Sequence, residues 1–362
     1  MLSTLKLTWQ KLAWSSCLSL LLHFAFFWMV AAASFSGYIG KWGMRDNTAR
    51  FSLEAMLDAS ADRPFVYRQL LPMLANGAAR LVPERIQARV AEKLNPAKVY
   101  TKTSAAANPA LGFRYVVVYY LSFLSLLGSV LLLHCIALDA GVGRLAALIA
   151  PAVLSLGFPY LQTIGGYFYD TAELLFFSLA YLLVSRRRIA WFFAILAPAT
   201  LNKESFFFYI ITLLPLLLAA YPRRKALAIA AAALLVSGLV NAAVKLHYAG
   251  AGGAPVELHL GDNLAAYLSL RTYSQMELTY GIMGPRQAFV PTLLLIATVF
   301  ARGWRASPRE VRQHMLLAAA VNLPLFVLFA AVAELRNLSL MFVGFAIVIG
   351  KALEAEPAKP LP

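Results

Sequence analysis

Charged residues are scarce in this chain of 362 residues. They make up only 14% of it, whereas hydrophobic residues make up 60%. A typical soluble domain carries about 25% charged residues, so the composition excludes an ordinary soluble protein. The apolar residues form runs of about 15 to 22, a length that suits the ~30 Å hydrocarbon core of a bilayer. The sequence therefore predicts an all-α, polytopic helical membrane protein.

Cysteine and the common catalytic motifs are nearly absent. Cys17 and Cys135 both lie within apolar runs, which excludes a disulfide framework. The five histidines lack the spacing of metal ligands. The segment "GVGR" at 141–144 lacks the third glycine of a dinucleotide fingerprint, and there is no P-loop. No cofactor is therefore indicated, although a divalent metal ion stays open, and the energy for any reaction must arrive with a membrane-borne or external substrate.

Acidic residues are outnumbered by basic ones, 17 against 32, which gives a net charge of +15. Such a charge could indicate a nucleic-acid partner or the positive-inside bias of a membrane protein. The positions decide, because the basic residues gather between apolar runs at 186–188, 223–225 and 302–312. We therefore expect a lipid bilayer as the partner and no nucleic acid.

The apolar runs predict about ten transmembrane helices in one integral-membrane module, 1–362. The candidate spans are 12–33, 114–136, 145–161, 169–185, 190–201, 205–221, 226–246, 287–301, 315–333 and 338–352. With both termini in the cytoplasm, every arginine cluster lies inside, as does the short C-terminal tail 353–362. The loops 34–113 and 247–286 then lie outside. The run 12–33 is too long for the core of a signal peptide, so it is expected to remain as the first span. The composition is typical of a bacterial inner membrane.

The first external loop, 34–113, is too long for a simple connection. We expect amphipathic helices in "TARFSLEAMLDASA", "RPFVYRQLLPMLANGAARLV" and "PERIQARVAEKLN". Pro72 is expected to kink the second helix, whereas Pro83 is at a permitted position in the first turn of the third. "PAKVYTKTSAAANPALG" is expected to be a loop. Apolar helices too short to span lie in the interface plane, so this loop is expected to rest on the outer membrane surface.

The stretch "PATLNKESFFFYI" places Asn202, Lys203 and Glu204 inside an apolar region. A charge at the centre of a bilayer costs roughly 2.5–3.5 kcal/mol. The preceding run, 190–201, is too short to cross alone and contains Pro198. We therefore expect a helical hairpin or broken helix that turns at "LNKE" and faces a wet cavity, because exposed backbone at this depth needs protein or water around it.

Acidic and basic residues occur together only on the predicted external side. Besides "LNKE", these are Arg45, Asp46, Asp58, Asp62, Arg63, Arg68, Asp170, Glu173, Asp262, Arg271, Glu277, Arg286, Glu334, Arg336 and Asn337. Ionisable residues within a membrane indicate a functional site. Structural interpretations stay open: Asp170 as a helix N-cap, Lys203 and Glu204 as a mutual ion pair, and Glu334 and Arg336 as turn residues. Tyr167 to Tyr169 favour an interfacial aromatic belt over sugar stacking.

The layout, together with "RPFVYRQLLP", "YDTAELLFF", "LNKES" and "AELRN", resembles the GT-C superfamily of integral-membrane glycosyltransferases. That resemblance implies a polyprenyl-phosphate-linked sugar donor and an acidic residue early in the first external loop as catalytic base or metal contact. Asp46 matches that position, although it stands alone between Arg45 and Asn47 where members of the superfamily usually carry an acidic pair.

We accordingly hypothesise a transferase with Asp46 as base and Asp170 as second choice. Arg68, Lys203 and Arg336 would hold the departing phosphate, whose charge grows in the transition state. Glu204 and Glu334 would orient those cations or contact the sugar, and Asn202 and Arg271 complete the predicted substrate site. Two other classes stay open: a transporter or flippase of a lipid-linked substrate, and a non-catalytic scaffold of an envelope-assembly complex. The sequence leaves the oligomeric state open.

Overall fold

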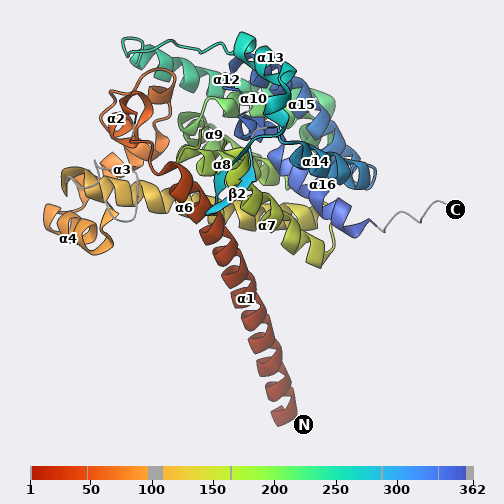
Figure 1. Cartoon of the computed structure of the whole chain (residues 1–362). Helices are drawn as coiled ribbons and strands as arrows, with labels where there is room; N and C mark the ends of the chain where they lie inside the picture. Colours follow the sequence, from red (N-terminus) through yellow and green to blue (C-terminus); the bar gives the residue numbers. More distant parts are fainter. Residues whose placement is uncertain are drawn as a thin grey trace.

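The computed structural model describes residues 2–46, 48–96, 109–163, 165–286, 288–332 and 334–355. Helices dominate this part of the chain (Figure 1). The principal helices are α1 (Leu2–Trp42), α6 (Pro109–Asp139), α7 (Arg144–Leu161), α8 (Tyr169–Ser185), α9 (Ile189–Asn202), α10 (Ser205–Thr212), α11 (Leu214–Ala220), α12 (Arg223–His247), α14 (Val290–Gly303), α15 (Arg309–Phe329) and α16 (Phe342–Glu354), with the 3₁₀-helix η5 (Leu335–Met341) before α16.

Six helices in the described ranges are long and apolar enough to cross a membrane. They are Leu18–Trp42, Leu111–Asp139, Arg144–Leu161, Arg223–His247, Arg309–Phe329 and Leu335–Glu354. The chain is therefore a multi-pass membrane protein, but the predicted count of ten is not confirmed. Each predicted span overlaps helix, but 205–221 is divided between α10 and α11, and α9 and α14 have 14 residues each. At 1.5 Å per residue each is about 21 Å long, which is short of a ~30 Å core.

One end of the helical body collects the arginine clusters. The Arg186 guanidinium lies 2.7 Å from the Asp139 carboxylate, and the Tyr221 hydroxyl donates to the Arg187 carbonyl at 3.3 Å. The Arg302 guanidinium donates to the carbonyl of Ala355, just after α16. We call this the arginine end. At the ends of α1, α9, α12 and α15, Arg45, Lys203, Lys245 and Phe329 line one cavity, and we call this part of the body the cavity end.

The segment between α1 and α6 forms a small helical layer at the cavity end. It comprises η1 (Ala49–Phe51), α2 (Leu53–Leu57), η2 (Phe65–Tyr67), α3 (Leu70–Leu81) and α4 (Glu84–Leu94). The Ser52 side chain caps α2 by accepting the Ala55 amide at 3.1 Å. Pro72 lies in the first turn of α3 and Pro83 is the N-cap of α4, so neither proline kinks a helix. The predicted loop lies largely in 97–108, outside the described residues.

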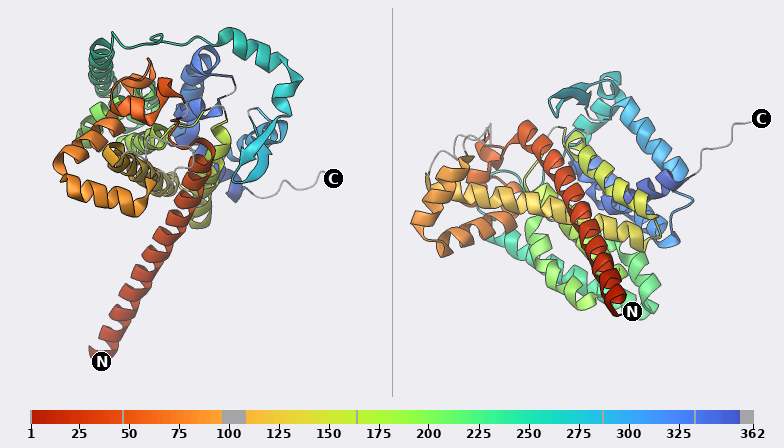
Figure 2. Two further views of the ribbon diagram at one scale, coloured as in Figure 1. Left: turned by 60° about the vertical axis from the view of Figure 1, so that its left-hand side comes forward. Right: turned by 90° about the horizontal axis from the view of Figure 1, so that it is seen from below.

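Helix α1 is longer than predicted, because it continues past residue 33 to Trp42. It ends at Gly43, whose φ of 56° is the left-handed conformation that glycine adopts without strain. Figure 2 shows α1 running from the N-terminus, well beyond the other helices, into the body of the protein. The chain between α1 and α6 therefore starts at the cavity end, directly beside the cluster described below.

A short antiparallel hairpin was not predicted. Strands β1 (Met276–Thr279) and β2 (Ile282–Pro285) pair Thr279 with Ile282. Tyr280 and Gly281 have φ values of 58° and 78°, as a two-residue turn with both residues left-handed requires. The one sequence signal that could have indicated this turn is the Tyr280-Gly281 pair, which was not used. An ion pair between Glu277 and Lys41 fixes the hairpin to α1. Burial raises the pKa of Glu277, although this ion pair acts in the opposite direction.

Candidate functional site

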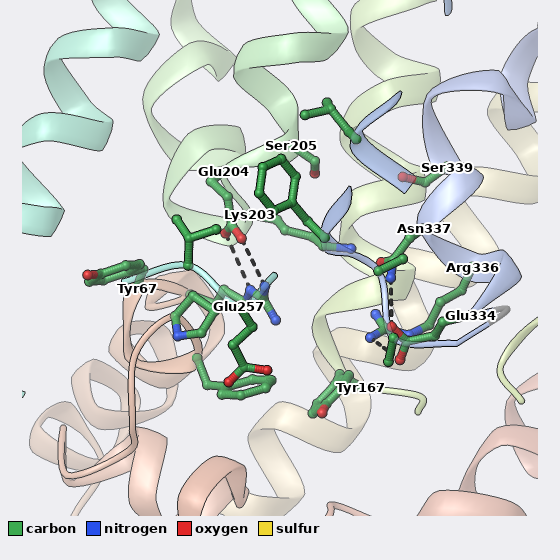
Figure 3. Close-up of a pocket in the computed structure, with 18 of the residues that line it drawn as sticks. Tyr67, Tyr167, Lys203, Glu204, Ser205, Glu257, Glu334, Arg336, Asn337 and Ser339 are labelled. Carbon is green, nitrogen blue, oxygen red and sulfur yellow. Dashed lines mark hydrogen bonds and ion pairs between the residues drawn. The ribbon is translucent and has the colours of Figure 1, made fainter. Parts of the chain in front are cut away.

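A buried cluster of charged residues lies at the cavity end, where α8 begins (Figure 3). Asp170 and Glu173 are one turn apart at the start of α8. The Arg336 guanidinium lies 2.8 Å from the Asp170 carboxylate and 2.7 Å from that of Glu334. The Lys203 ammonium lies 2.8 Å from Glu173 and 3.6 Å from Asp170. Three segments that are distant in sequence therefore meet through their charges.

The small helical layer between α1 and α6 joins this cluster through Arg68. Its guanidinium forms two bonds with the Glu204 carboxylate, at 2.9 and 3.3 Å, and a third with the Tyr169 hydroxyl. Arg68 follows η2, so its position depends on the fold between α1 and α6. The two-pronged geometry matches the planar fork of arginine, which lysine would not reproduce.

The predicted break at "LNKE" is present. Helix α9 ends at Asn202, Lys203 is extended with φ −162° and ψ 137°, and α10 begins at Ser205. The Asn202 amide donates to the Tyr169 carbonyl at 3.1 Å, which anchors the break to α8. Asn202 and Lys203 are 1% and 6% exposed, so protein covers the break. Lys203 pairs with Glu173 and Asp170, whereas Glu204 pairs with Arg68, so the two neighbours do not form the mutual pair considered above.

Aromatic rings separate the cations of the cluster. Tyr167 and Tyr169 stack with their ring centroids 5.0 Å apart. The Arg336 guanidinium carbon lies 4.8 Å from the Tyr167 centroid, and that of Arg68 lies 4.8 Å from the Tyr169 centroid. The interpretation of Tyr167 to Tyr169 as an interfacial belt was wrong, because all three residues are buried inside the protein, and Tyr167 and Tyr169 contact its cations. Their hydrophobic neighbours along the chain made them resemble a belt.

The inner cluster contains more acids than bases. Asp170, Glu173, Glu204 and Glu334 are four carboxylates, and Arg68, Lys203 and Arg336 are three cations, so the formal sum is −4 + 3 = −1. Each of these cations already faces a carboxylate. A buried ion pair repays its desolvation only if it stays paired. These three cations are therefore committed to holding the fold together and have little attraction left for a further anion.

A cavity of about 540 Å³ opens beside the cluster. Its lining contains apolar side chains from α10, α15 and η5, including Phe208, Leu325, Phe326, Phe329 and Leu340. The lining also contains polar, charged and aromatic residues: Arg45, Arg50, Phe51, Phe65, Tyr67, Arg68, Tyr167, Glu173, Lys203, Glu204, Ser205, Lys245, Glu257, His259, Asn322, Glu334, Arg336, Asn337 and Ser339. The cavity thus combines apolar and charged groups, as an amphipathic ligand requires.

The structure brings together most of the predicted site residues. Arg68, Lys203, Glu204, Glu334 and Arg336 line the cavity, and Asp170 and Asn202 lie directly behind them. Two others lie elsewhere. Asp46 is outside the cavity lining, where its carboxylate accepts the Tyr115 hydroxyl at 2.7 Å. Arg271 is exposed in the 3₁₀-helix η4 (Leu270–Tyr273), also outside the lining.

Asp170 is an N-terminal anchor as well as a charge partner. Its carboxylate accepts the Tyr167 amide at 3.0 Å and the Gln162 amide at 3.3 Å, in addition to the bond from Arg336. With so many donors directed at it, this carboxylate is poorly suited to accept a proton. The interpretation of Asp170 as the N-cap was wrong, because Phe168 is the N-cap of α8 and Asp170 lies in the first turn of the helix.

Two cavity residues, Arg45 and Glu257, had no role assigned from the sequence. Glu257 lies on the segment between α12 and α13 (Leu260–Leu268). Its carboxylate pairs with Arg50 and lies 3.5 Å from the Nε2 of His259. No motif marks Glu257, because the segment folds back over the cavity through contacts that are distant in sequence: the Arg63 amide donates to the Gly252 carbonyl at 2.8 Å.

Within the described ranges, no group of three or more His, Cys, Asp or Glu side chains is arranged to hold a metal ion. No protein-family model, curated protein or solved structure matches the chain. The site must therefore be interpreted from its own chemistry.

Proposed function

We propose that this protein is a membrane glycosyltransferase that moves a sugar from a polyprenyl-phosphate donor to an envelope lipid, glycan or protein acceptor. The observation that carries this proposal is the mixed lining of the cavity. Its apolar side chains suit an isoprenoid chain, and its carboxylates, cations and aromatic rings suit a sugar and a phosphate. A lining of this kind fits the polyprenyl-phosphate-linked sugar donor that the resemblance to the GT-C superfamily implies.

The reaction needs one base and one anion-stabilising group. The acceptor hydroxyl attacks the anomeric carbon, the bond from that carbon to the phosphate oxygen breaks, and the phosphate leaves with the bonding electrons. A carboxylate takes the hydroxyl proton, and a cation stabilises the growing charge on the phosphate. The bond that forms, the bond that breaks and the transferred proton are all assigned, so the reaction balances without a redox cofactor.

Glu257 is the best-placed base. Among the carboxylates lining the cavity, Glu173 accepts bonds from Lys203, Ser205 and Ser339. Glu204 is held by Arg68, and Glu334 is held by Arg336 and Asn337. Arg68 occupies both oxygens of Glu204, whereas one oxygen of Glu257 pairs with Arg50, which Asp62 shares, and the other lies 3.5 Å from the Nε2 of His259. Asp46 stays the alternative base, since the neighbouring Arg45 lines the cavity.

We place the cavity on the outer face of a bacterial inner membrane, with both termini in the cytoplasm. The collection of all three arginine clusters at the opposite end of the helices supports this orientation through the positive-inside bias. Ser274→Cys and Ala306→Cys, each in a Cys17→Ala/Cys135→Ala background, test it. A membrane-impermeant maleimide should label Cys at 274 in intact cells, and Cys at 306 only after permeabilisation. The reverse pattern would refute the orientation.

The decisive assay is release of polyprenyl phosphate from a panel of polyprenyl-phosphate sugars by the purified protein in lipid nanodiscs. Release that requires an acceptor supports the proposal. A transporter of a lipid-linked substrate is the second candidate, because the helix break at Lys203 is a feature that transporters use for binding. Tight donor binding without release from any donor, together with movement of donor across proteoliposomes, would favour that alternative.

A further inference from the structure

Arg45 differs from every other buried cation of the site. The residue is 9% exposed and lines the cavity, and no hydrogen bond or ion pair joins its side chain to any residue in the part of the chain that the structure describes. Its Nε is buried without a partner. Arg68, Lys203 and Arg336 each have a carboxylate within 3 Å. Burying an unpaired charge is costly, so an isolated buried guanidinium indicates an anion that binds from outside the chain.

Three aromatic rings hold Arg45 in position. Its guanidinium carbon lies 4.8 Å from the ring centroid of Trp42, 4.6 Å from that of Phe51 and 5.0 Å from that of Tyr167. We call these three rings the Arg45 cage. The Trp42 indole is itself fixed, because its Nε1 donates to the Gln162 carbonyl at 2.9 Å. The faces of these three rings stabilise the charge of Arg45 by cation–π attraction. They cannot accept the hydrogen bonds that its guanidinium offers.

The backbone at Arg45 is also unusual. Its φ is 64°, a left-handed conformation that residues with a Cβ adopt at a cost. Glycine or asparagine would be the ordinary choice there. The conformation turns the chain sharply after α1 and places the side chain against Phe51 and Tyr167, at the edge of the cavity.

We propose that Arg45 is the anion-binding residue of the cavity and that its ligand is a phosphate ester. The planar fork of arginine matches two phosphate oxygens at once, and the arginine retains its full charge for this ligand because no carboxylate neutralises it. The identification of that phosphate as the lipid-linked donor rests on the function proposed above, whereas the anion site itself does not. The proposal moves phosphate binding away from Lys203, Arg68 and Arg336, which pair with acids of the chain.

Binding can be measured without turnover, because Trp42 touches Arg45. In a variant that keeps Trp42 and changes the other five tryptophans to Phe, Trp42 fluorescence in lipid nanodiscs reports occupancy of the cage. The probes are a polyprenyl phosphate, the matching free polyprenol and inorganic phosphate. Retention of radiolabelled polyprenyl phosphate provides a second readout that is independent of the tryptophan.

We expect saturable binding of polyprenyl phosphate and none of polyprenol at the same concentrations. Arg45→Asn removes the charge with a residue that tolerates positive φ, so the variant should fold, and its affinity should fall about tenfold or more. Arg45→Lys should lie between. The matched control is Arg114→Gln, because Arg114 lies outside the cavity lining and pairs with Asp58. Its affinity should stay within about threefold of the parent.

The outcomes separate the two proposals. If Arg45→Asn binds phosphate as tightly as its parent, or if no phosphate binds the parent at all, the anion site is refuted. Inorganic phosphate that binds in an Arg45-dependent manner while polyprenyl phosphate does not would sustain the anion site and refute the lipid-linked donor. Arg45-dependent binding of polyprenyl phosphate without sugar transfer would sustain the anion site and refute the transferase.

Discussion

The Arg68 guanidinium lies 2.9 Å from the Glu204 carboxylate, across 136 residues of sequence. This pair connects the helical layer after α1 to the break between α9 and α10. Because a second, 3.3 Å bond joins the same two groups, the contact fixes orientation as well as distance. The position of the first layer over the cavity therefore depends on a residue in the middle of the chain.

Removing either partner of this pair should cost more than removing both. Arg68→Met or Glu204→Gln leaves a mostly buried charge with one fewer partner, so each should lower stability by about 1–3 kcal/mol. The double variant Arg68→Met/Glu204→Leu should recover part of that loss. Thermal unfolding in detergent, followed by intrinsic fluorescence, gives the three values. Additive losses would show that the two groups do not interact.

Neutralising Asp170 should unfold the site. Asp170→Asn deprives Arg336 and Lys203 of a shared carboxylate at a position that is 2% exposed, and removing one partner of such a buried group costs about 3–5 kcal/mol. Asp139→Asn is the matched control. Its pair with Arg186 is exposed, so the change should stay within about 1 kcal/mol. The thermal unfolding midpoints of the two variants, each compared with that of the parent protein, test this difference. A stable Asp170→Asn protein that lacks only turnover would instead make Asp170 catalytic.

Glu257→Gln should abolish most sugar transfer while leaving donor binding intact. A general base contributes about 10²–10⁴-fold, so kcat should fall by that factor with little change in KM. Asp46→Asn should have a much smaller effect, since Asp46 lies outside the cavity lining. Initial rates of polyprenyl phosphate release by the two variants provide the comparison. Loss of rate in Asp46→Asn alone would transfer the base assignment to Asp46.

Gly303 should tolerate no side chain. A Cβ there would lie 2.2 Å from the Val348 carbonyl oxygen of α16, and that backbone cannot move aside. Gly303→Ala should therefore push α14 from α16 and destabilise the protein by about 1–3 kcal/mol. Gly157 of α7 has open space around it, so Gly157→Ala should be neutral or stabilising by up to about 1 kcal/mol. Equal unfolding midpoints for the two variants would contradict the close approach of the helices.

The sequence predicted the helix break and the meeting of charges, because both follow from the cost of polar groups in an apolar region. Asn202 and Lys203 had to be covered by protein, and they are. Pairing was less predictable. Which acid faces Lys203 depends on how α8 packs against α9, and no local pattern encodes that packing. Arg45 was counted among the external charged residues but received no role, because the lack of a partner for its side chain is visible only in the folded chain. The hairpin at 276–285 was missed because the apolar runs around it dominated the assignment.

The contact between Asp170 and Arg336 also has a consequence for biosynthesis. The two residues are 166 positions apart, so a chain that emerges N-terminus first carries Asp170 long before its main partner exists. Until η5 is made, Lys203, which is shared with Glu173, is the cation that faces this carboxylate among the described residues. A chain that stops short of Arg336 therefore keeps an incompletely neutralised acid inside its helices. The site thus gains its full complement of ion pairs only when the last part of the chain has been made.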